Sequence, residues 1–237
     1  MEVIILAGGL GTRLRSVVSE VPKCMAPVAG KPFLWYLLQY LKRYDVSRVI
    51  LSVGYLRDVI FRWIDEVRDE FPFCIDYAVE ESPLGTGGGI RLAMQHVHGD
   101  SALILNGDTY FDVDLHALAA QHDLHPEAQL VLALKPMVDF DRYGTVISDE
   151  NGKILAFREK QPCDKGLING GVYWLKGSSL FSGLPEKFSF ETEVLTRHCG
   201  SEGCLFGLPQ DCYFIDIGIP EDYHRAEQEL PKMFHLI

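Results

Sequence analysis

The chain has 237 residues, with 22 Lys or Arg against 33 Asp or Glu, and its formal net charge at pH 7 is −11. This length can bury a substantial hydrophobic core, which excludes a miniprotein that depends on disulfides. The negative charge repels phosphate backbones and anionic lipids, so we expect no nucleic-acid partner and no membrane partner. A polyanionic ligand would therefore need a local group of cations.

The cysteines and the N-terminus bear on the cellular compartment. Six cysteines are scattered without a Cys-x-x-Cys pair, and the first residues lack the basic-then-apolar pattern of a signal peptide. No apolar run approaches the roughly 20 residues of a membrane span. We expect reduced thiols and a cytoplasmic protein. His198, Cys199 and Cys204 lie close together, but their spacing matches no zinc site, so we expect no zinc.

The first part of the chain alternates buried strands with amphipathic helices. Continuous apolar runs predict strands at residues 3–6, 48–53, 74–79 and 102–105. Apolar residues at helical spacing predict helices over residues 32–44, 57–71 and 90–97. Glycine-rich turns follow two of the strands, at residues 8–11 and 85–89. This order predicts an α/β fold, a three-layer α/β/α sandwich whose active face lies at the carboxyl ends of the strands.

From about Gln129 the pattern changes to shorter strands, predicted at residues 130–135, 143–148, 153–159 and 170–175. The chain contains no Ser-, Pro- or Gly-rich linker and no repeat. We therefore expect one catalytic domain over residues 1–237, with a nucleotide-binding half at about 1–128 and a second-substrate half at about 129–237 that share one sheet. Because 21 residues follow Asp216, we expect no C-terminal regulatory module.

The first glycine loop does not match the two common phosphate-binding fingerprints. A dinucleotide-binding loop requires a third glycine where Leu14 stands, and a kinase or ATPase loop requires Gly-Lys-Ser/Thr, whereas this chain has Gly11-Thr12 followed by Arg13. Bare amides, the hydroxyl of Thr12 and the guanidinium of Arg13 are nevertheless suited to phosphate. A plain tight turn is the alternative interpretation.

The longer segment GGLGTRLRSVVSEVPKCMAPVAGKP, residues 8–32, resembles the signature of the sugar-phosphate nucleotidyltransferases. Their pattern is G-x-G-T-R, then P-K, then P-V-x-G-K-P, and the one departure is Cys24, where proline is common. The segments ESPLGTGGG, NGD, DRYGTV, LINGGVY, KFSFE and YFIDIGIPEDY extend the resemblance over nearly the whole chain. They are most similar to the branch that acts on heptose 1-phosphate with GTP. The resemblance implies a Rossmann-like mixed sheet of the nucleotide-diphospho-sugar transferase type.

The implied reaction is attack of a sugar 1-phosphate oxygen on the α-phosphorus of a nucleoside triphosphate, with release of pyrophosphate. A phosphomonoester is largely dianionic at neutral pH and needs no general base. The protein must instead bring two polyanions together and neutralise their charge. By resemblance, Arg13 holds the pyrophosphate and Lys23 lies at the α-phosphate, while Asp108 and Asp216 bind Mg²⁺. Hydrogen bonding to the backbone is the alternative for each carboxylate.

The resemblance assigns further residues to the two substrates. The nucleotide set is Leu6, Ala7, Gly8, Gly9, Gly11, Thr12, Arg13, Lys23, Glu80, Gly85, Thr86 and Asp108. Glu80 would accept from the N1–H and the 2-amino group of guanine, which favours GTP; a strand-end glutamate that faces water is the alternative. The sugar-phosphate set is Gly144, Glu159, Lys160, Asn169 and Gly170.

Three other functions stay open at this point. Two lie within the family: transfer of guanylyl to mannose 1-phosphate, and transfer of uridylyl to N-acetylmuramate 1-phosphate. The third is a regulatory subunit that binds nucleotide sugars without catalysis, which the presence of Arg13, Lys23, Asp108 and Asp216 argues against. A homo-oligomer is possible for any of them.

Overall fold

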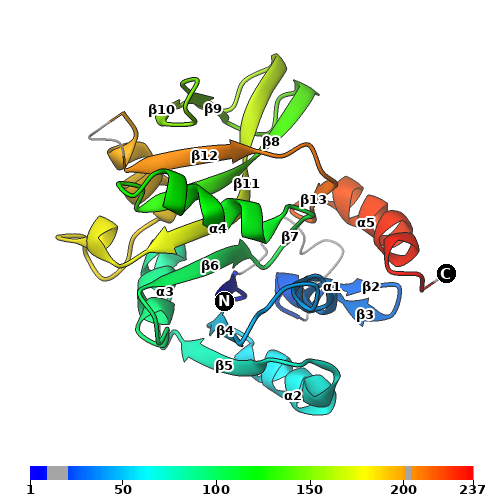
Figure 1. The fold of residues 1–237 in the computed structure, drawn as a ribbon. Helices are drawn as coiled ribbons and strands as arrows, with labels where there is room; N and C mark the ends of the chain where they lie inside the picture. Colours follow the sequence, from blue (N-terminus) through cyan, green and yellow to red (C-terminus); the bar gives the residue numbers. More distant parts are fainter. Residues whose placement is uncertain (10–20, 201–203, 237) are drawn as a thin grey trace.

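The computed structural model describes residues 1–9, 21–200 and 204–236, which are built around a nine-stranded mixed sheet (Figure 1). Its parallel part consists of β1 (Glu2–Leu6), β4 (Arg48–Val53), β5 (Cys74–Val79) and β6 (Ser101–Asn106). Its second part consists of β8 (Leu130–Phe140), β9 (Thr145–Ser148), β10 (Ile154–Phe157), β11 (Cys163–Lys176) and β12 (Leu205–Pro209). β11 runs antiparallel to β6 and joins the two parts.

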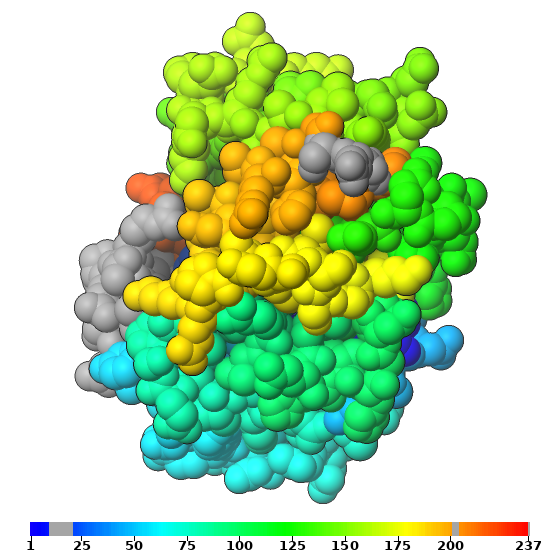
Figure 2. Space-filling model, turned by 90° about the vertical axis from the view of Figure 1, so that its left-hand side faces the viewer, coloured from blue at the N-terminus to red at the C-terminus, as the bar shows by residue number. Residues whose placement is uncertain are grey.

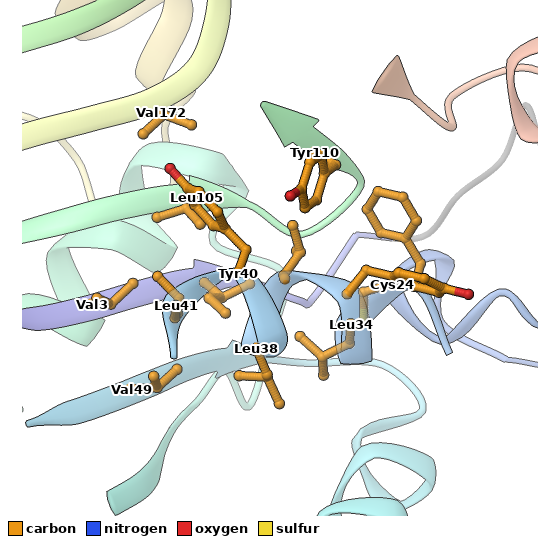
Figure 3. Close-up of a cluster of buried hydrophobic side chains, with 14 of the residues drawn as sticks. Val3, Cys24, Leu34, Leu38, Tyr40, Leu41, Val49, Leu105, Tyr110 and Val172 are labelled. Atoms are coloured by element: carbon orange, nitrogen blue, oxygen red, sulfur yellow. The ribbon is translucent and has the colours of Figure 1, made fainter. Parts of the chain in front are cut away.

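Helices cover both faces of this sheet, as the uninterrupted apolar runs of its strands require. Successive residues of β1 alternate between two cores: Val3 and Ile5 belong to one, and Ile4 belongs to the other. The first core, part of which Figure 3 shows, is closed by α1 (Phe33–Leu41), α2 (Arg57–Val67), α4 (Leu115–Leu124) and α5 (Pro220–Met233). The second core is closed by α3 (Gly85–Met94), a 3₁₀ turn at Ser179–Phe181 and a π-helical turn at Glu191–Thr196. This confirms the predicted three-layer α/β architecture.

Several predicted boundaries were wrong. The glycine-rich residues 85–89 do not form a turn before a helix, because α3 begins at Gly85. The helix predicted to reach residue 71 ends at Val67 and continues as a short 3₁₀ turn, Arg68–Glu70. The strand predicted at residues 170–175 is part of β11, which has 14 residues and changes register between Asn169 and Tyr173. That change allows one strand to pair with β9 near its start and with β6 near its end.

Two short ladders outside the main sheet position residues near the carboxyl ends of the parallel strands. β7 (Thr109–Phe111) pairs with β13 (Phe214–Asp216), and Asp216 lies opposite Thr109. β2 (Pro27–Val28) pairs with β3 (Lys31–Pro32) after a 3₁₀ turn at Lys23–Met25. Segments that are distant in the sequence therefore meet at one edge of the fold.

All six cysteines lie in the described ranges, and none of them forms a disulfide bond there. Across those same ranges, no helix has the length and apolar character needed to cross a membrane.

Candidate active site

Lys23, Asp108 and Asp216 form a compact charged cluster. The Nζ of Lys23 lies 2.5 Å from Oδ2 of Asp108 and 3.6 Å from Oδ1 of Asp216. The side chain of Lys23 is 11% exposed, against 34% for Asp108 and 29% for Asp216. The structure thus brings together three of the four residues that the sequence assigned to catalysis.

The backbone around this cluster leaves no room for side chains at two glycines. A Cβ on Gly107 would lie 2.3 Å from the carbonyl oxygen of Leu6, to which the Gly107 amide donates at 3.1 Å. This close approach seats Asp108 beside the end of β1. A Cβ on Gly218 would lie 2.8 Å from Oδ1 of Asp216, and the Gly218 amide donates to that same oxygen at 2.7 Å. The backbone beside Asp108 therefore requires glycine at position 107, whereas Gly218 lets its amide hold the carboxylate of Asp216.

Lys23 stands on a short, well-anchored turn. Pro22 precedes the 3₁₀ turn and its carbonyl accepts from the amide of Met25 at 2.8 Å. Cys24 and Met25, the other two residues of the turn, are buried. Burial, and next the negative charge of Asp108, raise the pKa of the Cys24 thiol to about 12. Cys24 stands at the position where proline is common in the family. Because its thiol is neutral and buried, it anchors Lys23 as an apolar side chain would.

A cavity of about 680 Å³ opens beside β1, β4 and β5. Its lining includes the predicted nucleotide residues Leu6, Gly8, Gly9, Glu80, Gly85 and Thr86. It also includes Ser52, Gly54, Tyr55, Arg57, Glu81, Ser82, Pro83 and Gly89, which the sequence analysis did not assign. Ala7 is buried, with its amide bonded to the carbonyl of Ser52 at 2.8 Å. This cavity is large enough for a drug-sized ligand such as a nucleotide.

Glu80 is held at the wall of this cavity and does not simply face water. Its Oε1 accepts from the Ser52 hydroxyl at 3.2 Å, and its Oε2 accepts from the amide of Leu84 at 3.0 Å. Each carboxylate oxygen has two lone pairs, so both oxygens can accept a further hydrogen bond. Glu80 is thus preorganised to meet a donor pair, and it also fixes the turn that leads into α3.

The glycines at the start of α3 serve packing against residues 186–190. A Cβ on Gly87 would lie 2.2 Å from the ring of Phe188, and one on Gly88 would lie 2.6 Å from the carbonyl of Glu186. The hydroxyl of Thr86 accepts from the amide of Phe190 and donates to Glu191. In Figure 2 the segment near residue 185, in yellow, lies directly against the green-cyan region that contains α3. Later parts of the chain thereby hold one wall of the larger cavity.

A smaller cavity, of about 330 Å³, reaches the charged cluster at Asp216. It is lined by Arg142, Tyr143, Lys160, Asp216, Gly218, Ile219 and Asp222. Burial, and next the charge of Asp216, raise the pKa of Tyr143 to about 12, so its phenol stays protonated at neutral pH. The smaller cavity therefore offers two cations and a phenolic hydroxyl close to Asp216.

The remaining sugar-phosphate residues lie at different depths in the second part of the sheet. Glu159 is exposed beside Lys160. Gly144 packs on the backbone of Arg158, because a Cβ there would lie 2.4 Å from that residue's carbonyl oxygen. Asn169 donates to the buried hydroxyl of Tyr173 at 2.8 Å and accepts from the amide of Gly171. Gly170 is buried against Phe111, so backbone packing already explains this glycine.

Three predicted residues, Gly11, Thr12 and Arg13, lie outside the described residues. Sequence reasoning missed Tyr55 and Arg57 at the larger cavity and Arg142 and Asp222 at the smaller one. The signal for the last two was present, because DRYGTV and YFIDIGIPEDY contain them.

The two carboxylates of the cluster are suitable ligands for a divalent cation that also binds phosphate. Asp108 and Asp216 converge on one point, where they already share the ammonium of Lys23. Among the residues that the structure describes, no third His, Cys, Asp or Glu completes a protein-only metal site. Two carboxylates with substrate phosphates are the set that suits Mg²⁺, which keeps few protein ligands.

The chain is similar over nearly its whole length to known proteins. The model of the family described as nucleotidyl transferase matches residues 2–233. The D-glycero-alpha-D-manno-heptose 1-phosphate guanylyltransferase of Aneurinibacillus thermoaerophilus is 46% identical over 97% of this chain and 98% of its own. The protein of the same name from Campylobacter jejuni is 45% identical over 94% and 97%. The crystal structure of HddC from Yersinia pseudotuberculosis complexed with GMP-PN covers 96% of this chain and 98% of its own, with 38% identity and a TM-score of 0.83.

Proposed function

Because this chain belongs to the nucleotidyl transferase family, we propose that it transfers the guanylyl group of GTP to D-glycero-α-D-manno-heptose 1-phosphate, giving GDP-heptose and pyrophosphate. The observation that carries the proposal is the Lys23–Asp108–Asp216 cluster, together with the two cavities near it. Leu6 lines the larger cavity and accepts from Gly107, next to Asp108, whereas Asp216 lines the smaller cavity itself. The two relatives named for this reaction, similar over nearly their full length, supply the substrates.

The larger cavity is proposed to hold GTP. Its volume of about 680 Å³ suits a nucleoside, and the bare backbone of Gly8 and Gly9 at its wall permits close approach of phosphates. The carboxylate of Glu80, fixed by Ser52 and Leu84, is proposed to accept from the N1–H and 2-amino groups of guanine. Gly11, Thr12 and Arg13 are proposed to hold the β- and γ-phosphates, which form the leaving group.

The smaller cavity is proposed to hold the sugar 1-phosphate, with Lys160 at its phosphate. Glu159 and Asn169 are proposed to contact sugar hydroxyls, and Gly144 and Gly170 to border the ring. The phosphate is already dianionic near neutral pH, so it attacks without a general base. Its approach to the triphosphate requires neutralisation of charge, and Lys23 is proposed to supply part of it beside the α-phosphate.

Mg²⁺ is the cofactor proposed for the pair Asp108 and Asp216. When bound, it supplies positive charge that screens the phosphates and polarises the phosphorus under attack. Lys23 has a separate role in this scheme, since it offsets the repulsion between the two carboxylates before substrates arrive. We further propose that the chain is one catalytic domain, in which residues 1–128 bind the nucleotide and residues 129–237 bind the sugar phosphate. We also propose that the enzyme works in the cytoplasm.

The test is a matrix of GTP, UTP, CTP and ATP against heptose, mannose and N-acetylmuramate 1-phosphates, scored by release of pyrophosphate. We expect the highest kcat/KM for GTP with heptose 1-phosphate, and a product with the mass of GDP-heptose. Preference for mannose 1-phosphate or for UTP would reassign the substrates. Binding of GTP without pyrophosphate release in any combination would instead identify a regulatory subunit.

A further inference from the structure

Asp222, at the start of α5, is the one charged residue of the described ranges that is fully buried, with 5% of its surface exposed. It lies between two arginines. Nη2 of Arg142 is 2.5 Å from its Oδ2, and Nη1 of Arg225 is 3.1 Å from its Oδ1. A buried carboxylate is costly unless it is paired and hydrogen-bonded, so this arrangement holds both guanidinium groups in place.

The two arginines differ in where they point. Arg142 comes from the connection between β8 and β9 and lines the smaller cavity together with Lys160 and Asp216. Arg225 lies one turn along α5 from Asp222 and is not part of that lining. Only Arg142 is therefore presented to a ligand that fills the smaller cavity.

Arg142 keeps hydrogen-bonding capacity for such a ligand. Among described partners, the only hydrogen bond of its side chain is the one from Nη2 to Asp222. Its Nε and Nη1 groups remain as donors, and 43% of its side chain is exposed. Its guanidinium carbon lies 5.5 Å from the ring centre of Tyr143, which limits its movement further. The fork geometry of arginine suits bidentate contact with phosphate oxygens.

The charges of the smaller cavity require such a cation. Asp216 and Asp222 both line it, and the phosphate of a sugar 1-phosphate would add further negative charge beside these two carboxylates. Lys160 alone, an exposed lysine on a flexible stem, is a weakly fixed partner for that dianion. Arg142 has the same charge as Lys160 and donors for a phosphate, and it also has a rigid support, which Lys160 lacks.

We propose that Arg142 binds the phosphate of the sugar 1-phosphate together with Lys160, and that Asp222 is the positioning residue that aims its guanidinium into the smaller cavity. This inference rests on the proposed function, since it assigns the phosphate subsite of that reaction. It predicts that Arg142 affects the sugar substrate and leaves the nucleotide substrate unaffected, because Arg142 does not line the larger cavity.

The experiment measures KM and kcat for heptose 1-phosphate at saturating GTP, and the reverse, in Arg142→Gln and Arg225→Gln. The two variants remove the same charge from the same carboxylate, so they serve as a matched pair. We expect Arg142→Gln to raise KM for heptose 1-phosphate at least about tenfold, as loss of a charged hydrogen bond predicts, with KM for GTP within about twofold of wild type. Arg225→Gln should leave both KM values within about twofold.

The double variant Arg142→Gln/Asp222→Asn separates binding from structure. It removes the buried carboxylate that Arg142→Gln leaves half-paired, so it should recover thermal stability and also serve if Arg142→Gln folds poorly. A purely structural role predicts that KM for heptose 1-phosphate recovers as well, which would overturn the inference. Phosphate binding predicts that this KM stays raised.

The remaining outcomes are also decisive. An unchanged KM for heptose 1-phosphate in Arg142→Gln, or an equal rise in Arg225→Gln, contradicts the inference alone, provided that the wild type releases pyrophosphate. A wild type that releases none with any sugar 1-phosphate contradicts the proposed function itself.

Discussion

The ammonium of Lys23 lies 2.5 Å from the carboxylate of Asp108, although 85 positions separate them in the sequence. The contact joins the 3₁₀ turn at Lys23–Met25 to the end of β6. It also places a positive charge next to the two carboxylates that are proposed to bind the metal. Lys23 is therefore an internal counter-ion of the acidic pair, in addition to its proposed role beside the substrate phosphate.

Replacement of Lys23 by alanine should separate these two roles. We expect Lys23→Ala to lower kcat about 10²- to 10³-fold, the usual cost of losing a preorganised electrostatic donor. Binding of Mn²⁺ without nucleotide should become tighter, because the competing ammonium is gone. Steady-state kinetics and calorimetric Mn²⁺ titration measure the two effects, with the exposed Lys42→Ala as control. A kcat near that of the wild type would refute the assignment of Lys23.

Removal of divalent metal should abolish turnover. In EDTA we expect no pyrophosphate release, and addition of excess Mg²⁺ should restore the original rate. Asp216→Asn should raise the Mg²⁺ concentration needed for half of the maximal rate, since a neutral amide is a poorer ligand for a hard cation. Robust turnover in EDTA would contradict the metal assignment to Asp108 and Asp216.

Glu80→Gln should relax the preference for GTP. A glutamine presents one acceptor and one donor where guanine requires two acceptors, so an N–H group would face an N–H group of the base. We expect the ratio of kcat/KM for GTP to that for UTP to fall at least about tenfold, since a buried unpaired donor is costly. Ser52→Ala, which removes only one support of the carboxylate, is the control for indirect effects. An unchanged ratio in Glu80→Gln would show that Glu80 serves only to hold the turn before α3.

The six thiols should differ sharply in reactivity. The pKa of Cys24 is raised to about 12, so its thiolate, the reactive form, is scarce at pH 8 and increases only as the pH rises toward 12. Cys74 is exposed. A disulfide reagent at pH 8 should therefore label Cys74 rapidly and Cys24 only after unfolding, as peptide mass mapping would reveal. Fast labelling of Cys24 in the folded protein would show that the turn below Lys23 opens.

Gly87→Ala should destabilise the fold. The added methyl would lie 2.2 Å from the ring of Phe188, which is 4% exposed and cannot move aside freely. Overpacking of this kind costs about 1–3 kcal/mol, measurable by urea unfolding. Gly99→Ala is the control, because the nearest atom to a Cβ there is 4.0 Å away. Equal unfolding free energies for both variants would contradict the packing argument.

The sequence predicted the parallel strands well, because their signal is local. Residues 48–53 and 74–79 coincide with β4 and β5, since strands covered on both faces must be apolar throughout. β11 was predicted too short, because several of its first residues are polar and they include a glycine, Gly166. Gly170 lies so close to Phe111 that a Cβ would be 2.3 Å from the ring, and no local pattern reveals this partner.

The start of α3 shows how tertiary contacts override local propensity. Four glycines among residues 85–89 are typical of a turn. The structure instead makes them helical, because Gly87 and Gly88 pack tightly on Phe188 and Glu186 and their amides bond the carbonyl of Phe188. Packing of this kind compensates for the poor helix propensity of glycine.

The candidate site was predicted unevenly for a similar reason. The resemblance brought Lys23, Asp108 and Asp216 into one group, although their spacing alone carries no sign of contact. The pair Arg142 and Asp222 went unnoticed, because an arginine and an aspartate 80 positions apart are unremarkable until the fold buries the carboxylate.

The β7–β13 ladder has a consequence for the order in which the protein matures on the ribosome. Every residue that lines the larger cavity lies between positions 6 and 89, so this part of the molecule is synthesised early. Asp216 reaches Asp108 only through β13, which is translated far later. Pairings between such distant segments form slowly, since a long loop must close first. A nascent chain therefore contains the lining of the larger cavity before it contains the residues near Phe188 that support one wall of it, and before it contains Asp216. Both the larger cavity and the charged cluster are completed only late in synthesis.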